Sequence, residues 1–130
     1  MIMQMFCTAS VNPGASSTSF YSYQVALNTF TLCRIPIPIP GTLVRVDIKV
    51  SVSGTLGSGE TVQHFARIND SVDVGQVDLA YDATHVAGSA VASHAVVAGD
   101  FIAIKVIHPA WVTSPTTVRY YGSVVIESVV

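Results

Sequence analysis

Charged residues are scarce in this sequence of 130 residues. They make up 11% of the chain, against about 25% in an ordinary soluble domain. The net charge of −2 and the total of six lysine and arginine residues exclude the basic patch that nucleic-acid binding needs, because such binding depends on neutralising phosphates. A small domain with so few charges has a surface rich in apolar and small side chains, and such a surface favours association with partners.

Long apolar runs are also absent. Stretches such as residues 95–98 and 101–103 fall far short of the about 20 residues that span a bilayer, so we expect no membrane segment. Residues 1–7 are apolar but lack a basic residue and are interrupted by Gln4, which is not typical of a signal peptide, and we expect them to stay in the mature protein. The hydrophobic fraction of 50% excludes intrinsic disorder and fits one domain with its own core.

Cysteine occurs only twice, at Cys7 and Cys33. A chain that is not exported meets a reducing cytosol, and a domain of this length needs no covalent staple. We therefore expect two free, buried thiols. A disulfide is the alternative, if the strands that carry the two residues are neighbours.

Motifs for catalysis or metal binding are missing as well. The sequence has no G-x-S-x-G nucleophile turn, and the glycine-rich residues 54–59 lack the lysine and the helix of a phosphate-binding loop. Neither the histidines nor the densest acidic run has the spacing of a zinc or calcium site. These residues are His64, His85, His94 and His108, and Asp70, Asp73, Asp78 and Asp82. We expect a protein without enzymatic activity, metal or cofactor, although an oligomer could bring copies of one histidine together on a symmetry axis.

Valine dominates what the sequence does contain, and β-branched residues favour sheet over helix. Over residues 44–52 the even positions are all apolar, and the odd positions are Arg45, Asp47, Lys49 and Ser51. This period of two predicts a strand with one face buried and the other in water.

The same alternation predicts further strands, with turn residues such as Asn69 and Asp70 between them. Apolar faces are expected at Tyr21, Tyr23, Val25 and Leu27, then after a phase slip at Phe30 and Leu32; at Val62, His64, Ala66 and Ile68; at Val77, Leu79 and Tyr81; and at Ile102, Ile104 and Val106. A long closing strand is expected from Val118 to about Val129. Pro36, Pro38 and Pro40 require an extended edge segment. We therefore predict an all-β protein, an antiparallel β-sandwich of jelly-roll type with about eight strands.

Trp111 is the only tryptophan and lies in a loop that Pro109 and Pro115 flank. An exposed aromatic ring on a rigid loop is how sugar-binding β-sandwiches present a stacking platform, so this residue is a candidate glycan site. The alternative is that the indole closes one end of the sandwich. We favour this alternative, because Ala110 and Val112 offer no polar groups to orient a sugar.

Two passages resemble small jelly-roll proteins from the virions of tailed bacteriophages. The first begins at residues 34–43, RIPIPIPGTL, which fit a P-x-P-x-x-G-T-L pattern, and an R-x-N turn follows at residues 67–69. The second is residues 96–106, VVAGDFIAIKV, with a V-x-A-G-D turn before a core strand. The resemblance covers most of residues 20–127 but not residues 82–94, which are rich in alanine and glycine where threonine and serine are expected.

The resemblance implies a fold akin to tumour-necrosis-factor and C1q heads, commonly trimeric, in a virion component. Such proteins decorate the capsid or form the distal domain of a head or tail fibre. A fibre tip normally carries a shaft, whereas here only residues 1–19 precede the first convincing strand. We therefore expect a capsid decoration (cement) protein, a homotrimer bound to the major capsid protein on the capsid surface of the virion and made in the cytoplasm of the host bacterium. The alternative is a receptor- or glycan-binding head domain of a phage fibre.

The expected division of the chain follows from this interpretation. Residues 1–19 are predicted to be an N-terminal arm, and residues 20–130 are predicted to be the jelly-roll domain. The large apolar side chains of the arm are those of Ile2, Met3, Met5 and Phe6. Because such side chains are a liability when exposed, we expect these four residues to bind the capsid or a neighbouring subunit.

Overall fold

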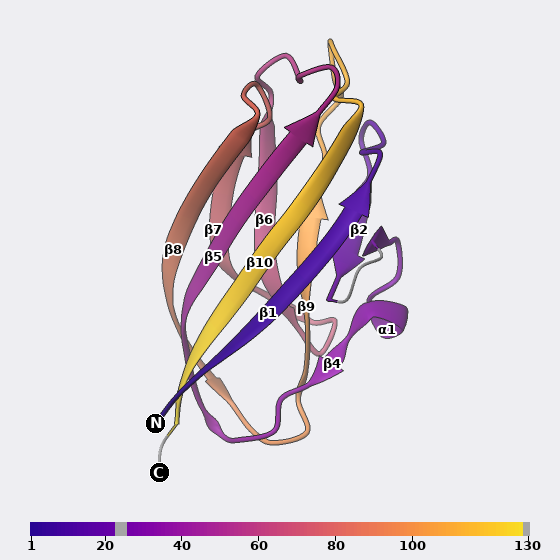
Figure 1. Ribbon diagram of the computed structural model, residues 1–130. Helices are drawn as coiled ribbons and strands as arrows, with labels where there is room; N and C mark the ends of the chain where they lie inside the picture. Colours follow the sequence, from indigo (N-terminus) through magenta and orange to yellow (C-terminus); the bar gives the residue numbers. More distant parts are fainter. Residues whose placement is uncertain (23–25, 129–130) are drawn as a thin grey trace.

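The computed structural model describes residues 1–22 and 26–128 and shows two antiparallel sheets packed face to face (Figure 1). The first sheet has the strand order β1-β10-β5-β8, and the second has the path β3-β2-β9-β6-β7 with β4 paired to β9. The strands are β1 (Ile2–Val11), β2 (Thr18–Tyr21), β3 (Ala26–Leu27), β4 (Ile35–Pro36), β5 (Gly41–Ser53), β6 (Thr61–Ile68), β7 (Val72–Ala80), β8 (His85–Val96), β9 (Phe101–Ile107) and β10 (Thr117–Ser128). This arrangement is an antiparallel β-sandwich of jelly-roll type, which confirms the predicted fold class.

The core lies between the sheets and follows the alternation in the sequence. The predicted inward faces of β6, β7 and β9 are confirmed, because Val62, His64, Ala66, Ile68, Val77, Leu79, Tyr81, Ile102, Ile104 and Val106 are all buried. On β5 the buried residue after Leu43 is Val46, because a bulge between Leu43 and Arg45 shifts the register. The prediction for Val44 is therefore wrong, and this residue is only half-buried.

A short helix, α1 (Phe30–Cys33), stands where the sequence predicts that a strand resumes. Phe30 and Cys33 share one face of the helical turn and are buried, whereas Leu32 is 72% exposed. The strand prediction is wrong here because Phe30 and Cys33 also fit a spacing of three. Leu27 is exposed rather than inward. The predicted inward residues Tyr23 and Val25, and the predicted strand end at Val129, lie outside the described part of the chain. Within the described residues no helix is long enough to cross a membrane.

Residues 2–11 correct the predicted N-terminal arm, because they form the strand β1 and pair with β10 along its length. Cys7 and Ala9 face the core and are buried. The alternation is present in the sequence, but Ile2 and Phe6 add apolar side chains on the outward side and mask it. Deletion of residues 1–12 would therefore remove a strand of the sandwich rather than a separate arm.

The strand β8 occupies residues that the sequence leaves without a predicted strand. Its inward positions include Gly88, where an added Cβ would lie 3.0 Å from a Val77 side-chain carbon and 3.2 Å from Leu79. The close approach of β7 therefore requires small side chains on β8. The alanine- and glycine-rich composition reflects this packing.

The passages that resemble phage proteins meet at one end of the sandwich. The Asn69 side chain donates to the Asp100 carboxylate (Nδ2–Oδ1 3.0 Å) and accepts from the Phe101 backbone N–H at 2.8 Å. Ile37 of the proline-rich segment exchanges backbone hydrogen bonds with the same turn, from its N–H to Asp100 at 2.7 Å and to its carbonyl from Gly99 at 2.9 Å. The residues of these motifs therefore hold three loops together.

An Asn69→Ala variant is expected to lose about 2 kcal/mol of unfolding free energy. It loses the bonds to Asp100 and Phe101, and it places alanine at a φ of 52°, a region that asparagine tolerates better. Chemical denaturation measures the change. The exposed Asn28 provides the control, and an Asn69→Ala variant no less stable than Asn28→Ala would contradict the role of this turn.

Both cysteines are buried and free. Burial raises the pKa of the Cys7 thiol to about 12, so the thiolate is not populated near neutral pH. The two residues belong to different apolar clusters. Cys7 lies between the sheets, and Cys33 lies on the buried side of α1 with Phe30, in a cluster with Phe20. They serve as small core side chains.

Candidate functional site

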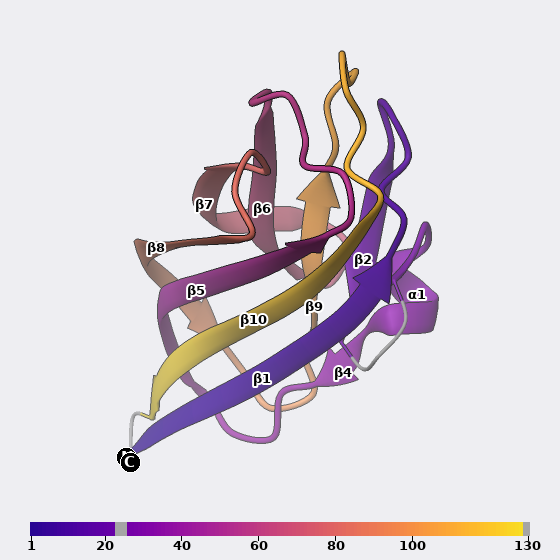
Figure 2. The same cartoon turned by 45° about the horizontal axis from the view of Figure 1, so that its top comes forward.

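No described element covers the outer face of the sheet β1-β10-β5-β8, which we call the open face (Figures 1 and 2). The register aligns its side chains in rows across all four strands. The rows are Gln4–Val125–Arg45–Val91, Phe6–Ser123–Asp47–Ser89, Thr8–Tyr121–Lys49–Ala87 and Ser10–Arg119–Ser51–His85. Residues from both ends of the chain and from its middle therefore form one surface.

A connected set of polar side chains lies at the centre of the open face. The Gln4 amide donates to Ser123 (Nε2–Oγ 3.1 Å), and Ser123 donates to the Asp47 carboxylate at 3.5 Å. Ser89 and Arg45 donate to the same carboxylate at 2.6 and 2.9 Å. Partial burial opposes ionisation of Asp47, but the hydrogen bonds from Ser89 and Arg45 outweigh it and lower the pKa of Asp47. The carboxylate is therefore charged at neutral pH and fixed by groups from all four strands.

Exposed apolar side chains surround this polar centre. They are Ile2, Phe6, Val91 and Tyr121, with exposed fractions of 68%, 67%, 88% and 38%. A hollow of about 440 Å³ is lined by Phe6, Lys49 and Tyr121. A second hollow of about 340 Å³ lies between Tyr121 and Arg119. Apolar side chains beside hollows, with a few fixed polar groups, are typical of a binding surface.

The charged side chains give the open face a net positive charge. Arg45, Lys49 and Arg119 are the cations, and Asp47 and Glu127 are the anions. The whole chain has a net charge of −2. The acidic excess therefore lies on other surfaces.

The four residues predicted to bind a partner lie on opposite sides of β1. Ile2 and Phe6 point outward from the open face, whereas Met3 and Met5 are half-buried and pack against the core. The prediction is therefore wrong for Met3 and Met5 as exposed contacts, because alternate residues of a strand face opposite sides. Tyr121 and Asp47 were not predicted, although each lies on the polar side of an alternating strand.

Trp111 lies at the loop end of the sandwich and is half-buried. Its ring packs on Tyr81 with a centroid distance of 5.9 Å, and it lies beside Gly57, where an added Cβ would be 3.4 Å from the indole. The indole Nε1 is buried without a partner among the described residues. Its neighbour Val112 is 88% exposed. The indole therefore covers the end of the core.

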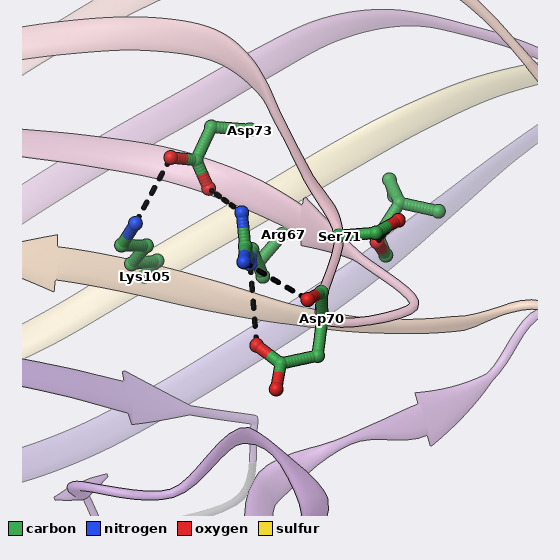
Figure 3. Close-up of polar contacts among 6 residues, drawn as sticks. Arg67, Asp70, Ser71, Asp73 and Lys105 are labelled. Atoms are coloured by element: carbon green, nitrogen blue, oxygen red, sulfur yellow. Dashed lines mark hydrogen bonds and ion pairs between the residues drawn. The ribbon is translucent and has the colours of Figure 1, made fainter.

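An ion-pair cluster lies on the outer side of the second sheet (Figure 3). Arg67 contacts Asp73 at 3.1 Å and Asp70 at 3.3 Å, and Lys105 contacts Asp73 at 2.9 Å. Asp78 lies on the same side, hydrogen-bonded to Gln76. Carboxylates outnumber cations in this cluster, so the cluster has the opposite net charge to the open face. At the other end of β9 the guanidinium of Arg34 lies over the Phe101 ring, 4.0 Å from its centroid, and adds a positive charge there.

The four histidines do not gather at one point, although the rings of His64 and His108 both lie near Tyr120. His64 and His108 are buried, His94 is half-buried and His85 is exposed. In the described ranges no three histidine, cysteine, aspartate or glutamate side chains gather in a way that could hold a metal ion.

Comparison with known proteins gives a similarity of fold. No protein-family profile and no curated protein matches the sequence. Among solved structures, the globular domain of zebrafish complement 1qA protein has a TM-score of 0.50 at 10% identity, covering 98% of this chain and 97% of its own. The acidic stable capsid structure of Helicobacter pylori bacteriophage KHP30 has a TM-score of 0.48 at 9% identity, covering 98% and 94%. The crystal structure of FLHE has a TM-score of 0.46 at 14% identity, covering 95% and 97%. At these identities the similarity shows the fold alone.

Proposed function

We propose that the protein is a structural virion protein of a tailed bacteriophage and decorates the capsid surface as a homotrimer. The open face carries this proposal, because Phe6 and Tyr121 beside the fixed Asp47 carboxylate have the composition of a protein interface, with aromatic side chains around satisfied polar groups. The passages that resemble phage jelly-roll proteins supply the virion context. The proposal includes no catalytic activity, metal or cofactor.

The distribution of charge supports a ring of copies. A ring needs heterologous contacts, in which two different surfaces of the chain meet. We propose that the open face of one copy packs against the β6-β7-β9 side of the next. This contact brings the net positive open face to the net negative ion-pair cluster of Arg67, Asp70, Asp73, Asp78 and Lys105, whereas a symmetric dimer of open faces would set two net positive faces against each other.

The contact with the major capsid protein is assigned to the end of the open face where the start of β1 and the end of β10 lie side by side (Figure 1). Met1 and Ile2 are 74% and 68% exposed there, and the Ser128 N–H donates to the Met1 carbonyl at 2.8 Å. In this arrangement Phe6 contacts a neighbouring subunit, and Met1 and Ile2 contact the capsid.

The stoichiometry in purified virions tests the proposal. We expect many copies per particle, in a fixed ratio to the major capsid protein, and rebinding of purified protein to capsids from which it has been stripped. A few copies per particle that remain with the fibres after the capsid is removed would contradict the proposal.

The hollow beside Tyr121 supports a second candidate, a receptor- or glycan-binding fibre head. An aromatic ring with Lys49, Ser89 and Ser123 around it could stack on a sugar and orient it. In that case Tyr121→Ala would abolish binding to host cells, and free surface polysaccharide would compete with the wild-type protein.

A further inference from the structure

A buried chain of polar side chains runs from the core to the loop end of the sandwich. The Tyr81 hydroxyl lies 3.0 Å from His64 Nε2, and the Tyr120 hydroxyl lies 2.5 Å from His108 Nε2. The Tyr81 and Tyr120 rings pack together with a centroid distance of 6.4 Å, and their hydroxyls interact with each other. All four side chains are buried. The chain therefore links β6 to the segment after β9 through side chains alone.

The outer end of this chain joins two loops. His108 Nδ1 lies 3.1 Å from Ser17 Oγ, which lies 2.6 Å from the Gly14 carbonyl oxygen. Two backbone hydrogen bonds run beside it, from Ser16 N–H to the Pro109 carbonyl at 2.9 Å and from His108 N–H to the Ser17 carbonyl at 2.8 Å. His108 therefore joins residues 12–17 to residues 108–116 through hydrogen bonds.

The contacts of Ser17 determine which nitrogen of His108 carries the proton. The Gly14 carbonyl can only accept, so the single hydroxyl proton of Ser17 is donated to it. His108 must then donate its Nδ1–H to Ser17 Oγ. Its Nε2 is left as an acceptor for the hydroxyl of Tyr120.

The same reasoning fixes the core end of the chain. Because Tyr120 donates to His108, it accepts from Tyr81, and Tyr81 then accepts from the Nε2–H of His64. His64 Nδ1 has no partner among the described residues, and in this tautomer it carries no proton. Every donor therefore points from the core toward the loops.

The groups that face the two rings from the packed elements are other aromatic hydroxyls and a thiol. Besides Tyr81 and Tyr120, these are Tyr21 of β2, whose ring stacks on Tyr120 at 5.1 Å, and Cys7 of β1, which faces Tyr21. No carboxylate, lysine or arginine contributes to the pKa of His64 or His108. A proton on either ring would therefore be a buried charge without a counter-ion.

We propose that this hydrogen-bond chain is a proton-operated latch, which holds residues 12–17 against residues 108–116 at neutral pH and releases them in acid. A proton on His108 Nε2 removes the acceptor of Tyr120, and the tyrosine bonds can then re-form only in the reverse direction. Reversal ends by placing a proton on His64 Nδ1, which has no partner. The alternative to this reversal is that the loops open and expose the protonated ring of His108 to water. This latch is a property beyond the proposed role in a capsid, and it does not depend on that role.

The direction of the pH dependence follows from burial. Burial lowers the pKa of His108 to about 4, and burial together with the charge of His108 lowers the pKa of His64 to about 3, against about 6.5 in water. Each ring therefore binds its proton more readily once it is exposed. The closed state keeps its full stability above about pH 6.5 and loses it as the pH falls toward about 4. For His108 alone, the ratio of open to closed molecules rises roughly 30-fold between pH 7.5 and pH 5.

Hydrogen exchange of the two loops at pH 7.5 and pH 5, corrected for the intrinsic rates, tests the latch in the full-length protein. We expect protection of residues 12–17 and 108–116 to fall roughly 30-fold at the lower pH, and the fluorescence of Trp111, in the second loop, to change over the same range. His108→Gln should remove this pH dependence. The matched control is His85→Gln, because His85 makes a similar bond to Ser51 at 3.1 Å but is exposed, and it should leave the dependence unchanged.

Nitrogen NMR of the wild-type histidines provides a test that needs no variant. We expect a proton on Nδ1 of His108 and on Nε2 of His64 at neutral pH. Loop protection that is equal at the two pH values, the opposite tautomer at His108, or an unchanged pH dependence in a folded His108→Gln variant would each overturn the latch.

Discussion

A Phe6→Asp variant is expected to fold normally and to remain a monomer at concentrations at which the wild-type protein forms trimers. Phe6 is 67% exposed and lines the hollow on the open face, so the substitution removes no core packing but buries a charge in the proposed contact. Loss of a central aromatic contact typically costs about 2 kcal/mol or more. A ring of three repeats the contact three times, so the trimer dissociation constant should rise by about four orders of magnitude.

Light scattering coupled to gel filtration measures this effect, and circular dichroism checks the fold. Val112→Asp is the matched control, because Val112 is 88% exposed but lies in the loop beside Trp111, away from the open face. Val112→Asp should remain a trimer. A Phe6→Asp variant that is still trimeric would show that copies associate through another surface.

The second large effect is expected at Trp111. Trp111→Ala should lower the unfolding free energy by about 3 kcal/mol, because the indole covers Tyr81 and Gly57 at the end of the core and its removal leaves a cavity. Thermal and chemical denaturation measure the change. The expected loss of unfolding free energy is at the lower end of the range for tryptophan-to-alanine substitutions, because Trp111 is only half-buried.

Two further variants separate packing from recognition at this position. Trp111→Phe keeps an aromatic ring over Tyr81 and should recover most of the lost stability. Val112→Ala changes an exposed neighbour and should stay within about 0.5 kcal/mol of the wild-type protein. A Trp111→Ala variant with wild-type stability and lost cell-surface binding would instead identify the residue as a glycan platform.

A strand could be predicted from the sequence where neighbouring residues differ strongly in polarity. Residues 44–52 alternate between valine or isoleucine and charged or hydroxyl side chains, and the strand is present there as β5. In β8 the inward positions must be small because β7 packs close to Gly88, so the two faces differ little in polarity. In β1 the outward Ile2 and Phe6 are as apolar as the inward residues, and the alternation is hidden in the same way.

Less of the candidate site than of the fold could be predicted from the sequence. Phe6 was identified because a large apolar side chain near a terminus needs a partner. The register that places it in one row with Ser123, Asp47 and Ser89 depends on which strands pair, and one sequence does not specify this. The position of His64 on an apolar face between Val62 and Ala66 was predicted, but its hydrogen-bond chain to His108 joins residues far apart in the sequence.

Sedimentation equilibrium of the wild-type protein at neutral pH and micromolar concentration tests most directly whether the open face is an interface between copies. The chain has a mass of 13.7 kDa. The ring of three predicts a single species of about 41 kDa. A species of 13.7 kDa that persists over that concentration range would contradict the assignment of the open face to self-association.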